Sequence, residues 1–261
     1  MTAPTLAATR PTIRLSPSTI ASLSVAALAW GALVVVVRHM GNGVGTMDLS
    51  LAEFVGMWAL MMVAMMLPAV APVASLYART IPIRQPGRGI SFVAGYLLVW
   101  TAIALPAYFV LRRLDDIGSD TTVRVMAAVV LAAAGVYQLT PVKTMCLRHC
   151  RSPLGQLLRY GNVGGRFKDL KVSVHHAAYC LGCCWVLMAI FVAFGFMNVW
   201  AMIGLAAVIV GEKLLRYGEV VGRAAGVAFM ALALLVAVSP RIADALLPDA
   251  PAPMSTPMPG M

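Results

Sequence analysis

The sequence predicts an all-α membrane protein, a bundle of about seven transmembrane helices. Two observations on composition and one on pattern lead to this fold class. Hydrophobic residues make up 61% of the 261 residues and charged residues only 11%, whereas an average soluble domain carries about 25% charged residues. The mean hydropathy is +0.86. The apolar residues also occur in separate runs, many of them close to the roughly 20 residues that a helix needs to cross a bilayer.

Short polar connections separate the apolar runs, and we expect each run to form one span. Residues 1–17 are polar and are expected to be disordered, ahead of a helical domain of residues 18–240. The apolar stretch 177–211 is too long for one span, so we expect a break near residues 195–198. The seven expected spans lie at residues 18–37, 51–76, 90–111, 125–142, 177 to the break, the break to 211, and 222–238. A Pro- and Met-rich tail, residues 241–261, is expected to be flexible.

The distribution of lysine and arginine predicts the orientation of the bundle, because cytoplasmic loops carry an excess of both. With the N-terminus in the cytoplasm, the strongly basic loop expected at residues 143–174 lies inside, and few basic residues lie outside. We therefore expect a multi-pass protein of the bacterial cytoplasmic membrane. The net charge of +10 then reflects this asymmetry, and the lipid bilayer rather than a nucleic acid is the expected partner.

All five cysteines fall in two clusters, and each cluster also contains histidine. The first cluster has the spacing i, i+3, i+4 and the second the spacing i, i+4, i+7, i+8, so on a helix the residues of each cluster would share one face. Thiolate and imidazole are soft ligands that suit Cu(I) or Zn(II) far better than hard ions such as Mg(II). The predicted ligands of this metal site are Cys146, His149 and Cys150 in the first cluster and His176, Cys180, Cys183 and Cys184 in the second.

A methionine ladder in the second span adds to this prediction. Met57, Met61 and Met65 recur every four residues, and thioethers hold Cu(I) without deprotonation. The pattern is similar to the Met-x-x-x-Met motif of eukaryotic high-affinity copper transporters. It favours Cu(I) over Zn(II), with the ladder as a second set of ligands. The alternative is that the methionines fill helix interfaces, as this adaptable side chain often does.

Other functions stay open at this point. No hydrolase, phosphate-binding or dinucleotide-binding motif is present, so an enzyme is not expected. The enzyme alternative is a membrane thiol-disulfide oxidoreductase that uses Cys180 and Cys183, and a third reading is a non-catalytic membrane scaffold. Glu212 ends a long apolar run, and we expect it to pair with Lys213 at the membrane interface.

Three motifs carry a resemblance to a known family. They are Met-Met-x-Ala-Met-Met-Leu-Pro at residues 61–68, Lys-x-x-Cys-Leu-x-x-Cys at 143–150 and Tyr-Cys-Leu-Gly-Cys-Cys-Trp at 179–185. With them the chain resembles a bacterial family described as predicted metal-binding integral membrane proteins. The resemblance implies a multi-span fold and a metal site at the cysteines. We therefore expect a soft metal bound at the cytoplasmic face, in transport, delivery or homeostasis, with a metal chaperone or another membrane subunit as partner.

Overall fold

The computed structural model describes residues 16–40, 46, 49–79, 87–115, 120–152, 155, 165, 167–195 and 198–239. Within these residues every regular element is an α-helix, which confirms the predicted all-α class. The predicted flexible tail lies outside the described residues, as does nearly all of the predicted disordered segment. The described helices are α1 (Pro17–Met40), α2 (Leu51–Arg79), α3 (Gly87–Ala102), α4 (Ala104–Asp115), α5 (Asp120–Gln138), α6 (Pro141–Cys150), α8 (Lys168–Phe194), α9 (Val199–Leu214) and α10 (Gly218–Val238).

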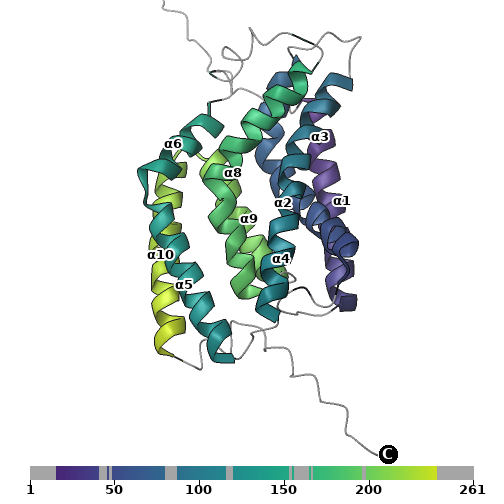
Figure 1. The fold of residues 1–261 in the computed structure, drawn as a ribbon. Helices are drawn as coiled ribbons and strands as arrows, with labels where there is room; N and C mark the ends of the chain where they lie inside the picture. Colours follow the sequence, from purple (N-terminus) through teal and green to yellow (C-terminus); the bar gives the residue numbers. More distant parts are fainter. Residues whose placement is uncertain are drawn as a thin grey trace, which may run out of the picture.

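Six stretches of the described chain are long and apolar enough to cross a membrane. Five of them are α1, α2, α5, α8 and α10, and the sixth runs through α3 and α4 from Gly87 to Arg113. Figure 1 shows these long helices side by side as a bundle. The expected sixth span, from the break to residue 211, corresponds to α9, which has 16 residues and a length of about 24 Å. That is shorter than the roughly 30 Å of a bilayer's hydrocarbon core, so the structure supports six full-length candidate spans.

The predicted break in the apolar stretch 177–211 is present. Helix α8 ends at Phe194, and Gly195 follows with φ 80°, a backbone conformation that glycine adopts at little cost. The Asn198 side chain then accepts a hydrogen bond from the amide of Ala201 and caps the start of α9, as asparagine commonly does. The chain therefore turns back here, and α9 returns toward α6 and the start of α10.

The predicted loop at residues 143–174 is wrong at both ends. Pro141–Cys150 form helix α6, and residues from Lys168 onward belong to α8. The reason is local: Thr140 accepts a hydrogen bond from the amide of Lys143, and Pro141 occupies the first turn, two features that start a helix. The preceding span ends at Gln138 instead of residue 142. Both cysteine clusters thus lie on helices, and α6 packs against α8.

Glycines bring α10 close to α5. A Cβ atom added at Gly226 would lie 2.8 Å from Cβ of Gln138 and 3.0 Å from the carbonyl oxygen of Gly135. Small residues in a membrane bundle allow backbones to approach in this way. Gly218, Gly222 and Gly226 recur every four residues, a pattern that favours such a contact. The contact sets the position of α10 beside α6 and α9.

Candidate metal centre

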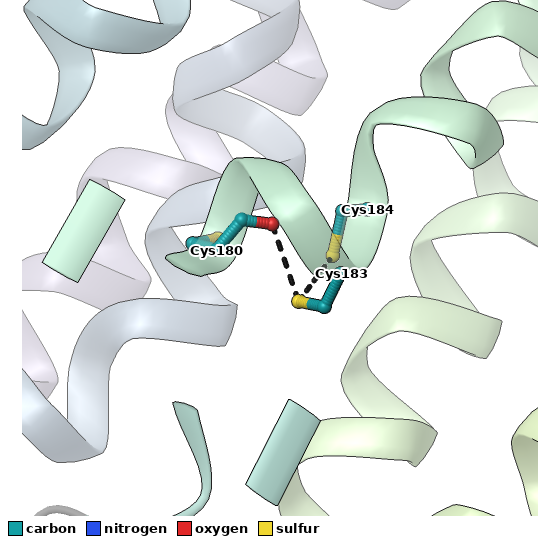
Figure 2. A group of neighbouring side chains, drawn as sticks. All are labelled: Cys180, Cys183 and Cys184. Carbon is teal, nitrogen blue, oxygen red and sulfur yellow. Dashed lines mark hydrogen bonds between the residues drawn. The ribbon is translucent and has the colours of Figure 1, made fainter. Parts of the chain in front are cut away.

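Three sulfur atoms gather on one face of α8 in the interior of the bundle. The Sγ atoms of Cys180, Cys183 and Cys184 all lie within 4.8 Å of one another, and the residues are only 0–1% exposed. Figure 2 shows the sulfur of Cys183 directed toward that of Cys184, 3.3 Å away. The helical spacing of these residues accounts for their common face. Their grouping agrees with the shared face predicted from the sequence.

Helix α6 adds a fourth thiol to this group. The Sγ of Cys150 lies 3.8 Å from the Sγ of Cys183. Sulfur atoms bound to one metal at about 2.3 Å would be separated by about 3.8 Å in a tetrahedral site and about 4.0 Å in a trigonal one. The separation between Cys150 and Cys183 matches these values, and Cys184 requires only a small side-chain adjustment. The donor set and its spacing therefore fit a thiophilic metal ion.

Two polar side chains from other helices contact Cys180, the first cysteine of α8. The Nζ of Lys213 on α9 lies 2.8 Å from the Sγ of Cys180, and the Tyr96 hydroxyl of α3 lies 2.9 Å from the same sulfur. Cys180 and Tyr96 are fully buried, where an ammonium group and a thiolate stabilise each other strongly because little water screens them. This lysine therefore favours the thiolate, the form of cysteine that binds metals.

Cys146 lies nearer the surface than the other four cysteines. It is half-buried, and partial burial raises the pKa of its thiol above the usual value. A Cβ atom at Gly182 would lie 3.0 Å from the Cys146 sulfur, so the glycine of the Cys-Leu-Gly-Cys segment makes room for α6. One turn further along α6, Cys150 is 7% exposed. Burial of the thiols thus increases from Cys146 through Cys150 to the α8 group.

The histidines lie around the thiols and outside the group of three cysteines on α8. The His149 ring stacks on Tyr179 with a centroid distance of 3.7 Å, which places this part of α6 on α8. His176 is 2% exposed, and its Nδ1 has no hydrogen-bond partner among the described residues. Its ring centroid lies 5.8 Å from that of Tyr96, the residue that contacts Cys180. The role of both histidines as ligands stays a prediction.

The methionine ladder lies inside the bundle. Met61 and Met65 are buried in α2, and Met57 is half-buried one turn earlier. Met61 and Met65 belong to the same hydrophobic core as the α8 cysteines. Helix α2 continues through Pro68 and Pro72 to Arg79. This packing is the one expected of methionine as an interface filler, and a metal-binding role of the ladder stays a prediction.

The expected surface pair of Glu212 and Lys213 is wrong. Glu212 is buried, and its Oε1 accepts hydrogen bonds from Nζ of Lys143 at 2.6 Å and from Nε2 of Gln138 at 2.7 Å. Neighbouring residues on a helix point about 100° apart, so α9 directs Glu212 toward α5 and α6 and Lys213 toward Cys180. Buried charges need such partners. The adjacent acid and base at the end of an apolar run were the available sequence signal for these two contacts, Glu212 with Lys143 and Lys213 with Cys180.

Comparison with known proteins supports a metal-related role for this arrangement. A family model described as PpoB2, copper chaperone, matches residues 55–236. The matched region is more than half of the chain and contains the methionine ladder and both cysteine clusters. No curated protein and no solved structure matches the chain.

Proposed function

The chain belongs to the PpoB2 copper chaperone family, and from this premise we propose that it binds Cu(I) at its buried cysteines and passes the ion to a partner. The observation that carries the proposal is the grouping of Cys180, Cys183 and Cys184 within 4.8 Å, with Cys150 of α6 3.8 Å from Cys183. These four thiols are the primary ligands. Cys146, His149 and His176 are the second set.

The family supports copper as the ion, and the donor set is compatible with it. Thiolates are the soft ligands that select Cu(I), although Zn(II) also accepts four sulfur ligands in tetrahedral geometry. Lys213 lies 2.8 Å from the Cys180 sulfur and offsets part of the negative charge of a site that holds a monovalent ion among several thiolates. The ammonium group thus lowers the cost of placing the loaded site in the bundle interior.

We place the protein in the membrane, with the metal centre near the cytoplasmic end of the bundle. Six candidate spans support the membrane location. The lysines and arginines around α6, α8 and the start of α10 support the orientation, because basic residues favour the cytoplasmic side. A metal chaperone or another membrane subunit would exchange copper with the protein at that side. The methionines of α2 would provide a further soft environment within the bundle.

The burial of the thiols suggests how the ion is exchanged. The α8 thiols are 0–1% exposed, Cys150 is 7% exposed and Cys146 is half-buried. Copper would therefore pass from the surface to Cys146, to Cys150 and then to Cys183 by stepwise exchange of thiol ligands. Cys146 and Cys150 are one helical turn apart on α6, and the Cys150 sulfur lies 3.8 Å from that of Cys183 on α8. The route therefore needs no large rearrangement of α8.

Dithiol chemistry is the second candidate function, and one observation favours it. Cys150 and Cys183 come from different helices, and their sulfurs are only 3.8 Å apart, so a small movement would allow a disulfide of about 2.05 Å. Alkylation before and after reduction separates the two functions by mass. A redox enzyme should contain a measurable oxidised fraction after purification, whereas a copper site should keep all five thiols reduced.

The proposal is tested by anaerobic titration of the detergent-purified protein with Cu(I) and, separately, Zn(II) against a competing chelator. We expect tight, near-stoichiometric Cu(I) binding that is lost when Cys180 and Cys183 are both replaced by serine. Met188→Leu is the matched control, since it changes a buried residue of the same helix with little change in volume. Unchanged copper stoichiometry in the double serine variant would refute the assignment. Preference for zinc would keep the site and remove copper as its cargo.

A further inference from the structure

A basic surface lies where α6 meets the beginning of α10. It consists of a cavity of about 440 Å³ and a second cavity of about 400 Å³, which share Arg148 and Glu219 as lining residues. None of the five cysteines lines either cavity, so this surface is separate from the metal centre. Its charged residues, which we call the arginine surface, are Lys143, Arg148, Arg151, Arg216, Arg223 and Glu219.

The arginine surface carries an excess of positive charge. Four of its five cations are arginines, and these four face one carboxylate, Glu219. Arg148 pairs with Glu219 at 2.8 Å, and Lys143 pairs with the buried Glu212 at 2.6 Å. The three other arginines have no carboxylate partner within 4 Å among the residues that the structure describes. Arginine presents several donors that match the oxygen atoms of a phosphate group, so the charge excess favours a phosphate-bearing anion.

The apolar residues of the same cavities indicate that this anion is part of a lipid. Leu139 and Met145 line the first cavity and Val220 the second, and all three are exposed. Tyr217 also lines the second cavity and is 67% exposed, a placement typical of tyrosine at the level of lipid headgroups. Cationic and exposed apolar side chains thus adjoin, as an amphipathic ligand requires.

We propose that the arginine surface binds an anionic phospholipid, with its phosphate on the arginines and its acyl chains along Leu139, Met145 and Val220. Basic pockets between helices at the cytoplasmic side are suited to such headgroups. The inference rests on the membrane location proposed above. The bound lipid connects α6 to α10, and because α6 carries Cys146 and Cys150, it holds the outer thiols in place over the α8 group.

The test uses the full chain in a neutral detergent. Native mass spectrometry counts retained lipid after addition of phosphatidylglycerol or phosphatidylcholine, and competition with inorganic phosphate tests the free anion. We expect preferential retention of phosphatidylglycerol, and a loss of about 30-fold in its affinity when Arg148 and Arg223 are both replaced by glutamine. Arg113→Gln is the matched control, because this exposed arginine lies in the last turn of α4, at the opposite end of α5 from α6.

Several outcomes would overturn the inference. Equal retention of both lipids, or unchanged retention in the double glutamine variant, would show that the arginines do not bind the headgroup. Displacement by millimolar inorganic phosphate would show a site for the free anion instead of a lipid. If the double variant does not fold, wild-type protein at raised salt gives the same test, because screening should weaken the binding. Copper titration of the same samples, and their recovery in the membrane fraction, report separately on the proposed function.

Discussion

The buried ion pair between Lys143 and Glu212 should be one of the most sensitive points of the fold. Their Nζ and Oε1 atoms are 2.6 Å apart, and the two side chains are 2% and 1% exposed. Lys143→Met would leave the Glu212 carboxylate in the interior with Gln138 as its remaining donor. Removal of one partner from a buried pair costs about 3–5 kcal/mol. Because the hydrogen bond from Gln138 persists, we expect a loss of about 3 kcal/mol in the free energy of unfolding.

The exposed pair between Arg148 and Glu219 provides a matched control in the same chain. Its atoms are 2.8 Å apart, but the arginine side chain is 69% exposed, and such pairs contribute about 0–1 kcal/mol. Denaturant unfolding in detergent, followed by circular dichroism, would compare Lys143→Met with Arg148→Gln. Glu212→Gln added to Lys143→Met should recover part of the loss, since it removes the unpaired charge. Equal effects of the two single substitutions, or no recovery in the double variant, would refute the reasoning.

Three further predictions concern the metal centre and its frame. Lys213→Met removes a charge-assisted contact worth about 1.5–3 kcal/mol. It should weaken the Cu(I) affinity measured by chelator competition about tenfold or more, whereas Lys213→Arg should retain part of that affinity. Gly226→Leu would force α10 away from α5 and should cost about 1–3 kcal/mol in the same unfolding assay. Burial raises the pKa of the Cys146 thiol. An ordinary thiol has a pKa of about 8.5, so the alkylation rate of Cys146 should still increase with pH where that of an ordinary thiol has levelled off.

Each of these predictions has its own control and contradicting result. Equal copper affinity of Lys213→Met and the wild type would show that the ammonium group does not support the site. Gly204→Ala is the control for the glycine substitution, because a Cβ at Gly204 meets nothing within 4 Å, and it should not destabilise the fold. For Cys146, peptide mapping by mass spectrometry gives the alkylation rate at this one thiol. A plateau at or below pH 8 would contradict the raised pKa.

The sequence by itself determined the helical class, the approximate position of most spans and the composition of the candidate site. Hydropathy over about 20 residues and the spacing of cysteines along a helix are local properties, so the chain states them directly. The grouping of Cys180, Cys183 and Cys184 follows from this spacing alone. The break near residues 195–198 also has a local signal, because Gly195 and Asn198 are residues that end and begin helices.

Only the tertiary structure decided which side chains from different helices meet. Cys150 reaches Cys183 because residues 141–150 form a helix that packs on α8, although residues 143–174 were predicted to form a loop. Lys213 faces Cys180 of α8, and its neighbour Glu212 faces Lys143 of α6. The reason is that consecutive residues of α9 point in different directions, toward different helices. These contacts depend on the directions in which α6 and α9 pack. The need to pair buried charges across helices favours that packing, and spacing along one helix cannot specify which charges meet.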